Sequence, residues 1–379
     1  MREGWKTMKL DDACFVDYGT RVVRKKDGGT IYPVYGGGGA TFQMDIYNRE
    51  NCLVVARFAM SQTCTRFVQG KFFLNDSGLT LRAKDKDLSQ QFLDWIIISK
   101  NDLIYSFGKG SAQKNLDMED FRNMEISFPV SLAEQQRIVD ILDQEFAKID
   151  ALKTNAEKSL QAAKDLFQAT TDTMLGNEKW RELTVGEIAK IKGGKRVPKG
   201  YKLEKEPTAH RYIRVADFTD QGTIRPESVL YISDEVFKTI KAYTITSKDV
   251  YISIAGTIGK SGIIPDALDG ANLTENACKL VLGPDYYNRF VFFATKTSSF
   301  KKQVETLTMQ AAQPKLALTR LATIRVRVPS SIQEQETVVA RLDGIADTIS
   351  LLQDNCQRTL TLCDDLKQSL LRKAFNGEL

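Results

Sequence analysis

Two runs of basic side chains carry the clearest chemistry in this chain. The first run is Arg21, Arg24, Lys25 and Lys26, and the second is Lys190, Lys192, Lys195, Arg196, Lys199 and Lys202. Lys and Arg in turns beside glycine can reach phosphates, and Arg can contact guanine bidentately, worth ~1–3 kcal/mol of base discrimination. A single charge run is usually a solvated loop. Here the run recurs at the same offset from Trp5 and from Trp180, which favours DNA contact.

Amide and glycine-rich stretches extend this hypothesis. Gln113 and its counterpart Gln313 precede the strand that enters each of two long helices, and amides of this kind can read adenine edges. Each glutamine could equally cap the small helix that follows. The run Gly36–Gly39 permits a tight turn or a close backbone approach to a partner. The candidate DNA-binding residues are Arg21, Arg24, Lys25, Lys26, Tyr35, Gly37, Gln113, Lys114, Lys195, Arg196, Lys199, Arg214, Lys260, Gln313 and Lys315.

Several enzyme motifs are incomplete. The stretch 255–261 (AGTIGKS) resembles the end of a phosphate-binding loop, but Ile254 stands where the first glycine belongs and no Walker B strand follows. The run Gly36–Gly39 lacks the strand, helix and downstream acid of a dinucleotide site. No adenine-methyltransferase motif is visible, and the single histidine, His210, leaves little material for a zinc site or a catalytic triad. The sequence therefore predicts no catalytic residue, no metal and no cofactor in this chain.

Composition sets wider bounds. The 379 residues suffice for two or three domains, and a net charge of +5 permits nucleic-acid binding without demanding it. The six cysteines form no CxxC pair, and Cys356 and Cys363 fall one heptad apart, which is typical of small core residues in a reducing compartment. No apolar run approaches the ~18 residues of a membrane span. We therefore expect a soluble, cytoplasmic protein without membrane contact.

A long helix is predicted from Pro129 to about Leu175. Ser131 lies three residues before Glu134, which is the spacing of a capping box. Roughly 45 residues without an interior Pro or Gly give a helix of about 65 Å at ~1.5 Å per residue. Its apolar face recurs every three or four residues. The residues of this face are Leu142, Phe146, Ile149, Leu152, Ala156, Leu160, Ala163 and Phe167.

A shift of 200 residues repeats this helix near the end of the chain. The second copy has Ser331 and Glu334 at its start and repeats Leu142, Ile149 and Leu166 as Leu342, Ile349 and Leu366. Two helices with matched caps and narrow apolar stripes most simply bury those stripes against each other as a coiled-coil pair.

The globular segments repeat as well. Trp5, Gly19 and Arg21 recur 175 residues later, whereas Leu116 recurs at Leu316, so the second globule carries about 25 extra residues in its interior. Short strands, among them CLVVARF at 52–58 and GLTLRA at 78–83, alternate with turns in both segments, and helices are expected near 91–99 and 287–293. This mixture predicts an α+β class with mixed α/β globules. The expected domains are residues 1–128, the first helix 129–177, residues 178–328, and the second helix 329–379.

Several repeated blocks resemble the specificity subunit of type I restriction–modification systems over essentially the whole chain. These blocks are YPVYGG at 32–37, GSAQKNL at 110–116, FPVSLAEQQRI at 128–138, PSSIQEQ at 329–335 and LRKAFNGEL at 371–379. The second half departs from this pattern, with AAQP at 311–314 where the first half has GSAQ at 110–113.

The resemblance implies two target recognition domains, each of which reads half of a split DNA sequence. It also implies that the two long helices are antiparallel and set the gap between the half-sites. It implies a non-catalytic subunit that docks two methyltransferase subunits using S-adenosylmethionine, and two translocase–nuclease subunits using ATP and Mg. Changing the helix length should then change the gap and leave each half-site intact. The competing hypothesis is a coiled-coil assembly scaffold whose globules bind proteins.

Overall fold

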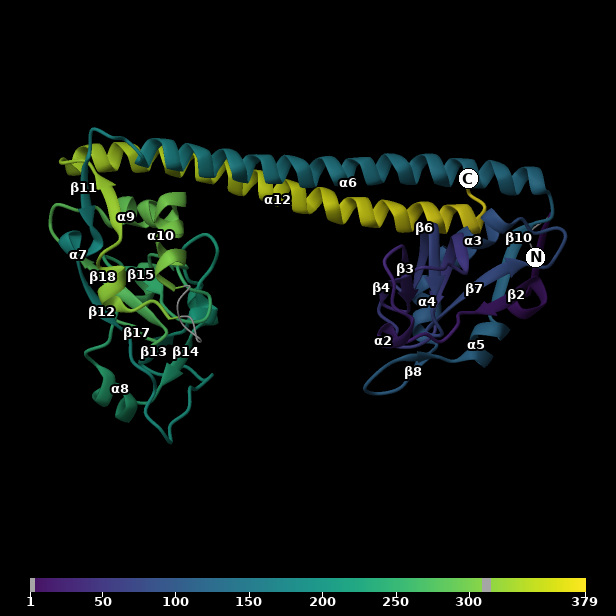
Figure 1. The fold of residues 1–379 in the computed structure, drawn as a ribbon, viewed down its shortest axis with the longest axis horizontal. Coiled ribbons are helices and arrows are strands. Elements are labelled where there is room, and N and C mark those ends of the chain that lie inside the picture. The colour runs from purple at the N-terminus through teal and green to yellow at the C-terminus, as the bar shows by residue number, and fades with distance from the viewer. Residues whose placement is uncertain (1–3, 309–314) are drawn as a thin grey trace. The chain divides into compact units, whose positions relative to one another are not determined.

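The computed structural model describes residues 4–308 and 315–379 (Figure 1). The chain divides into two compact units. Unit 1 comprises Met1–Ala156 and Gln357–Leu379, and unit 2 comprises Glu157–Cys356. Each unit therefore contains one globule together with half of each long helix.

Both long helices are confirmed. α6 spans Leu132–Leu175 and α12 spans Ile332–Asn376. The Ser131 hydroxyl accepts a hydrogen bond from the Glu134 amide at 3.3 Å, as an N-cap does. The Glu134 carboxylate binds Arg137 at 2.8 Å, and the Glu334 carboxylate accepts from the indole of Trp180 at 2.8 Å. Glu134 and Glu334, the glutamates of the two predicted capping boxes, thus both use their carboxylates to bond side chains.

The two helices pair in antiparallel fashion within each unit. In unit 1, Lys153 contacts Asp364 at 2.7 Å, and Lys367 forms an ion pair with Asp150. Arg137 donates to the backbone oxygen of Leu379 at 2.7 Å, so rising numbers on α6 meet falling numbers on α12. In unit 2, residues of α6 and α12 join one apolar cluster. Its members from these helices are Phe167, Met174, Leu175, Val338, Val339 and Leu342.

One part of the predicted apolar stripe is corrected. Leu142, Ile149 and Leu342 are buried as expected, and so are Cys356 and Cys363. In contrast, Leu152, which was predicted on this face, is 53% exposed. Leu166 and Leu366, which repeat each other outside the predicted face, are 66% and 48% exposed. A pair of helices offers a single seam, so it cannot cover apolar residues around the whole of each predicted face.

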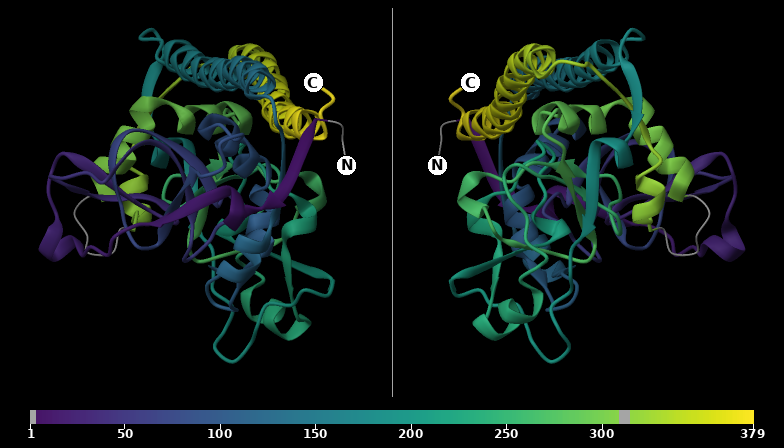
Figure 2. Two further views of the ribbon diagram at one scale, coloured as in Figure 1. Left: turned by 90° about the vertical axis from the view of Figure 1, so that its right-hand side faces the viewer. Right: turned by 90° about the vertical axis from the view of Figure 1, so that its left-hand side faces the viewer.

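The globule of unit 1 is built on a six-stranded sheet with strand order β2-β7-β5-β6-β3-β4. The strands of the whole globule are β1 Trp5–Lys9, β2 Cys14–Tyr18, β3 Tyr32–Gly36, β4 Gly39–Met44, β5 Arg49–Ala56, β6 Thr65–Leu74, β7 Gly78–Ala83, β8 Gly108–Lys109, β9 Asn115–Leu116 and β10 Glu125–Pro129. Its helices are α1 Leu10–Ala13, α2 Arg24–Asp27, α3 Gln90–Ser99, α4 Asn101–Ser106 and α5 Met118–Asn123. β1 pairs with β10 and reaches the C-terminal end of α12 (Figure 2).

The globule of unit 2 has sheets of order β12-β18-β15-β16, β14-β13-β17 and β11-β19. Its strands are β11 Arg181–Thr184, β12 Ala189–Gly193, β13 His210–Ile213, β14 Leu230–Ile232, β15 Val250–Ser253, β16 Ser261–Gly262, β17 Asn272–Leu273, β18 Ala277–Leu282 and β19 Arg325–Val328. Its helices are α7 Val185–Ile188, α8 Asp234–Ile240, α9 Asn288–Lys296, α10 Ser298–Thr308 and α11 Leu318–Leu321, with 3-10 turns η1 Val215–Asp217, η2 Pro226–Ser228 and η3 Asp266–Leu268. The mixed α+β class is confirmed.

The internal repeat is visible in backbone hydrogen bonds. The amide of Leu10 donates to the Met124 oxygen at 2.8 Å, and the amide of Val185 donates to the Ile324 oxygen at 2.8 Å. These bonds carry the predicted shifts of 175 and 200 residues. The helices predicted near 91–99 and 287–293 are α3 and α9, displaced by a few residues at their ends.

The same buried glutamine fastens each globule to its long helix. Gln135 and Gln335 are fully buried. The Gln135 side-chain oxygen accepts from the amide of Ser89 at 2.9 Å, immediately before α3, while its nitrogen donates to the Asp87 and Pro129 oxygens at 2.6 Å each. The side-chain amide thereby uses both of its N–H donors and one of the two lone pairs of its oxygen.

Gln335 makes the matching set of bonds in unit 2. Its oxygen accepts from the amide of Tyr287 at 2.8 Å, immediately before α9, and its nitrogen donates to the Asp285 and Pro329 oxygens at 2.9 and 3.4 Å. The PxSxxEQ block that opens both long helices therefore has a structural role, which is to hold the segment that leads into α3 in unit 1 and into α9 in unit 2.

A second anchor, Asp94 on α3, predicts a pH effect on stability. Asp94 is 9% exposed, its carboxylate accepts from Gln90 at 2.8 Å, and burial raises its pKa to about 6. The folded state therefore holds this proton more tightly than the unfolded state, so stability falls as the pH rises from the ordinary aspartate range to about 6. Asp94→Asn should raise the free energy of unfolding at pH 7 by about 1–3 kcal/mol, measured by urea denaturation.

The advantage of Asp94→Asn should vanish near pH 3, below the ordinary aspartate pKa, where wild-type Asp94 is largely protonated in both states. Asp12→Asn, an exposed acid of unit 1, serves as the control and should leave the unfolding curve unchanged. An Asp94→Asn advantage that is the same at both pH values would contradict the explanation.

Candidate nucleic-acid interface

One turn of unit 1 gathers most of the segments that carry candidate residues. We call Asn75–Ser77, between β6 and β7, the central turn of unit 1. The amide of Thr20 bonds the Leu74 oxygen at 3.0 Å, the amide of Asn75 bonds the Tyr35 oxygen at 2.9 Å, and the amide of Arg57 bonds the Ser77 oxygen at 2.8 Å. The stretches that begin near residues 20, 35 and 57 therefore meet at one end of the sheet.

Unit 2 repeats this arrangement around its own central turn, Thr274–Asn276. The amide of Lys195 bonds the Leu273 oxygen at 2.8 Å, the amide of Thr274 bonds the Ile213 oxygen at 3.0 Å, and the amide of Ile254 bonds the Asn276 oxygen at 2.8 Å. The shift is 175 residues at Lys195 and 199 at Leu273, so the extra residues of the second globule lie between these two positions.

The last candidate segment joins the same place in both units. The amide of Leu116 donates to the Arg57 oxygen at 2.8 Å, and the amide of Leu316 donates to the Ile254 oxygen at 2.9 Å. These bonds place the segments that contain Lys114 and Lys315 beside Arg57 and Ile254, whose own amides bond the central turns. Gln113 is exposed, and Asp117 caps α5 by accepting from two amides. Gln113 is therefore not the cap of this helix, which was the structural alternative to a DNA contact. Gln313 lies outside the described residues.

A glycine is required where each basic loop leaves the sheet. A Cβ on Gly19 would lie 1.9 Å from the Asn75 oxygen, and one on Gly194 would lie 2.0 Å from the Thr274 oxygen. Because both obstacles are backbone atoms, a side chain would displace the loop from the central turn. The glycines predicted as a repeat are thus the points at which the basic segments cross the sheet end.

We call the surface around the central turn of each unit its face. In unit 1, arginine and aromatic side chains form this face. The Arg57 guanidinium lies 4.8 Å from the ring centre of Tyr18 and 4.6 Å from that of Phe58. Tyr18 and Phe58 are 40% and 37% exposed, so the stack is open to solvent. Arg66 donates to the Gly37 oxygen at 3.0 Å and so ties the glycine run to β6. Exposed rings and guanidinium planes can stack on bases or contact base edges.

The basic run of unit 1 is not engaged in ion pairs with the residues that the structure describes. Arg21, Arg24 and Lys25 are exposed, and among residues 4–308 and 315–379 no carboxylate forms an ion pair with them or with Lys26. Three of the four lie in the short helix α2, where the sequence predicted a turn. Lys114 lies 4.2 Å above the Tyr105 ring. Tyr35 is partly buried and packs edge-on against Phe72, so it supports the face from beneath.

The basic residues of unit 2 are more often paired. Arg196 bonds Glu275 at 2.5 Å, which raises the pKa of its guanidinium, while the Lys195 ammonium lies 5.7 Å from the Tyr243 ring. Arg214, which follows Ile213 at the central turn, is held by Asp217 at 2.6 Å. Lys199 is exposed.

Two further basic residues of the sequence need comment. Lys190 and Lys192, which the sequence placed in a loop with the basic run, lie on β12 and pair with β18. Strand pairing keeps them away from the central turn, because the run leaves the sheet only at Gly194. This part of the predicted basic loop is therefore wrong.

Sequence reasoning missed the arginine and aromatic groups at the end of β5. Arg57, Phe58 and Arg66 stand in the face of unit 1, and Glu275 stands in that of unit 2. Arg57 and Phe58 follow directly after the apolar strand LVVA. An arginine and an aromatic residue at the end of a buried strand are the signal that could have revealed them.

Residues 255–260 of the stretch 255–261 lie in a turn between β15 and β16, and Ser261 begins β16. The Ser253 hydroxyl accepts from the amide of Lys260 at 2.8 Å, and the amide of Gly259 bonds the Ser253 oxygen at 2.9 Å. Lys260 leads into a strand rather than a helix and binds Asp220 at 2.9 Å, which lowers the pKa of that carboxyl. A phosphate-binding loop requires a helix N-terminus at this place, so the geometry agrees with the rejection of that motif.

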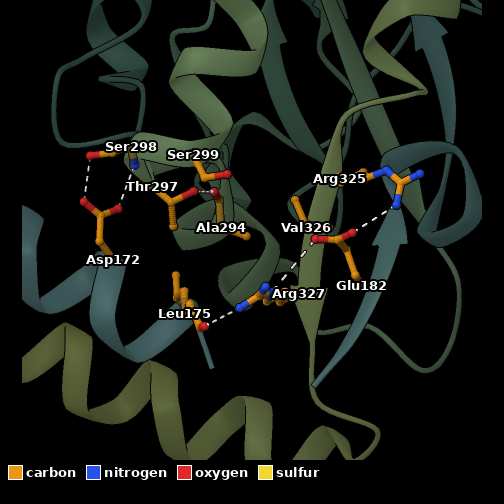
Figure 3. A pocket seen from close by; sticks show the side chains of 11 residues that line it. Asp172, Leu175, Glu182, Ala294, Thr297, Ser298, Ser299, Arg325, Val326 and Arg327 are labelled. Carbon is orange, nitrogen blue, oxygen red and sulfur yellow. Dashed lines mark hydrogen bonds and ion pairs between the residues drawn. The ribbon is translucent and has the colours of Figure 1, made fainter. Parts of the chain in front are cut away.

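A hollow of about 400 Å³ in unit 2 is occupied by structural contacts (Figure 3). The Asp172 carboxylate accepts from the amide and hydroxyl of Ser298 at 2.7 and 2.6 Å and so caps α10. Glu182 binds Arg325 at 3.0 Å, and Arg327 donates to the Gly176 oxygen at 2.6 Å. These groups satisfy one another and fasten the end of α6 to the globule.

Other kinds of site find little support in the described part of the chain. Among residues 4–308 and 315–379, no cluster of three His, Cys, Asp or Glu side chains could hold a metal ion, and none of the six cysteines forms a disulfide. Burial raises the pKa of Cys14 and of Cys278 to about 12, so neither thiol is reactive at neutral pH. None of the described helices combines the length and apolar character needed to cross a bilayer.

Comparison with known proteins adds independent evidence. The family model described as type I restriction modification DNA specificity domain matches residues 2–162 and 177–361. The type I restriction enzyme MjaVIII specificity subunit of Methanocaldococcus jannaschii is 21% identical over 309 residues, which cover 75% of this chain and 70% of that protein. The Escherichia coli EcoBI specificity subunit is 24% identical over a match that covers 65% of this chain and 57% of that protein. The Escherichia coli EcoDI specificity subunit is 21% identical over a match that covers 99% of this chain and 88% of that protein.

Solved structures share the fold. A chain from a study of complex assembly and conformational transition of the type I R-M system matches with a TM-score of 0.77 at 16% identity, covering 100% of this chain and 99% of that one. The HsdS subunit from Thermoanaerobacter tengcongensis matches with a TM-score of 0.52 at 17% identity, covering 100% and 98%.

Proposed function

The chain belongs to the type I restriction modification DNA specificity family, and we propose that it is a subunit that reads a two-part DNA sequence. Each globule recognises one half of the target through the face around its central turn. Backbone phosphates are contacted by the basic loops, and bases by arginine, amide and aromatic groups. The two faces differ in their residues, so the two half-sites differ in sequence.

The observation that carries this proposal is the repeated set of backbone bonds. In both units the bonds that start at Thr20 or Lys195, at Asn75 or Thr274, and at Leu116 or Leu316 gather the same candidate segments at the sheet end. Two faces built alike and equipped with different side chains suit two related readings of one duplex. Basic residues scattered over unrelated loops would not repeat in this way.

The long helices supply the remaining surface. Leu152 and Leu362 in unit 1 are 53% and 65% exposed, and Leu166 and Leu351 in unit 2 are 66% and 62% exposed. Uncovered leucines on otherwise polar helices favour packing against apolar partner surfaces. We assign this surface to two methyltransferase subunits, with S-adenosylmethionine as their methyl donor.

The chain itself contributes recognition, and catalysis belongs to its partners. Adenine methylation is assigned to the methyltransferase subunits, and cleavage to two translocase–nuclease subunits that use ATP and Mg. Membership of the family supports these assignments.

The proposal is tested by co-expressing the chain with a cognate methyltransferase subunit and mapping methylated adenines by single-molecule sequencing. The expected result is a split motif with a constant gap. If the two proteins copurify in the presence of S-adenosylmethionine and no motif is methylated, the recognition role fails and a coiled-coil scaffold becomes the better explanation.

A further inference from the structure

Unit 2 contains a basic pocket that the recognition faces do not use. The pocket has a volume of about 320 Å³ and lies between α6, α12, α9 and the loop at Asp220. Its lining includes four cationic side chains and one carboxylate, and its walls include Phe167, Phe292, Phe293 and Ile349. The cations are Lys164, Arg289, Lys296 and Lys301.

Three of these cations lack an acidic partner. Lys296 donates to the Ser261 oxygen at 3.0 Å and Lys301 to the Gln168 side chain at 2.6 Å, both of which are neutral groups. Across the described residues, no carboxylate forms an ion pair with Lys164, Lys296 or Lys301. The one acid in the lining, Asp220, is already bound by Lys260 at the rim.

Burial and, to a smaller extent, neighbouring positive charge act on the ammonium group of Lys296. Burial, together with Lys301 and Lys260, lowers the pKa of its ammonium to about 8. The Lys296 side chain also lies 4.9 Å from the Phe292 ring, in surroundings where water screens charge poorly. An anion entering the pocket would relieve this repulsion.

The equivalent pocket of unit 1 shows that folding does not require these lysines. That pocket, of about 510 Å³, is lined by Asp94, Asp143 and Asp150 and contains no Lys or Arg. There Asp143 accepts from Trp95 at 3.0 Å, whereas in unit 2 Asp343 binds Arg289 at 2.6 Å. The equivalent pockets beside the paired long helices are thus lined by acidic side chains in unit 1 and mainly by basic side chains in unit 2.

The helix pair carries the same contrast. Unit 1 has the ion pair between Lys153 and Asp364. A shift of 200 residues places Gln353 at the position of Lys153, and Lys164 at that of Asp364. Unit 2 therefore lacks the interhelix ion pair, and its Lys164 faces the pocket instead.

We propose that this pocket of unit 2 binds a phosphate group through Lys164, Lys296 and Lys301. Three ammonium groups beside an apolar wall match the charge of a phosphate and supply the several charge-assisted hydrogen bonds that its oxygens accept. The phosphate comes either from a free phosphate or nucleotide or from the DNA backbone, and the same three lysines serve both sources.

The test uses the full-length chain. Inorganic phosphate and pyrophosphate are titrated calorimetrically, and a 40-base-pair duplex, a length of about four helical turns, is titrated by fluorescence anisotropy at several salt concentrations. The variants are Lys164→Gln, which places an amide on an exposed helix position and should fold normally, and the double variant with Lys296→Met. Lys158→Gln, an exposed lysine of α6 outside the pocket, is the matched control.

A free-phosphate ligand predicts that the double variant loses phosphate affinity by about tenfold or more, with Lys158→Gln unchanged. A DNA phosphate predicts weak phosphate binding throughout, and a salt slope of duplex binding that falls by roughly 1–2 in the double variant. Either result supports the pocket, whereas phosphate and duplex affinities equal to wild type in Lys164→Gln and in the double variant would overturn it. Motif mapping reads base recognition separately, so failure of the proposed function is distinguishable.

Discussion

Replacing Gln135 with leucine should lower the free energy of unfolding of unit 1 by about 3–5 kcal/mol. Leucine preserves most of the side-chain volume but leaves the Ser89 amide and the Asp87 and Pro129 oxygens buried without their partner. Each such group costs about 1–3 kcal/mol. The loss is measured by urea denaturation followed through tryptophan fluorescence.

Two matched variants frame this result. Gln335→Leu should have a similar effect on unit 2, where the same amide bonds Tyr287 and Asp285. Gln136→Leu removes an exposed glutamine that bonds only Asp140 on the same helix, so it should change stability by less than about 0.5 kcal/mol. If Gln135→Leu and Gln136→Leu were equally mild, the buried amide would not be the fastening that the structure indicates.

Gly194→Ala should remove recognition of the second half-site, lowering methylation of the cognate motif by about 10- to 100-fold. The new Cβ would lie 2.0 Å from the Thr274 oxygen, so the loop carrying Lys195 and Arg196 must leave the central turn. Gly19→Ala should do the same to the first half-site, because its Cβ would lie 1.9 Å from the Asn75 oxygen. Single-molecule mapping of methylated adenines with the partner subunit present measures both effects.

The neighbouring glycine provides the control. A Cβ on Gly193 would lie 3.6 Å from Leu318, which is an ordinary contact, so Gly193→Ala should keep the methylation pattern. The prediction concerns the affected half-site, so each variant should relax or lose its own half of the motif. Equal loss of both halves from Gly194→Ala would indicate general unfolding instead of a displaced loop.

Sequence alone determined the parts of this protein that depend on periodicity and repetition. The two long helices, the shifts of 175 and 200 residues, the strands around LVVA and GLTLRA, and the burial of Cys356 and Cys363 all follow from local patterns. Such patterns are informative because helix and strand periods place residues on faces without reference to the rest of the chain. The family followed from the repeated boundary blocks for the same reason.

Only the tertiary structure decided which candidate residues meet. The central turns bring together segments near residues 20, 35, 57 and 116 through backbone bonds, and no local pattern specifies such pairings. For this reason Arg57 and Phe58 were missed, and Lys190 and Lys192 were placed in a loop although they lie on a strand.

The opposite charges of the two equivalent pockets likewise depend on side chains that are distant in sequence. Asp94 and Asp143 come from different elements of unit 1, as do Lys164 and Lys296 in unit 2. The local sequence pattern determines whether each segment forms a helix or a strand, because local preferences act within a few residues. Packing determines which charges share a cavity, because that depends on contacts between segments as distant as α6 and α9.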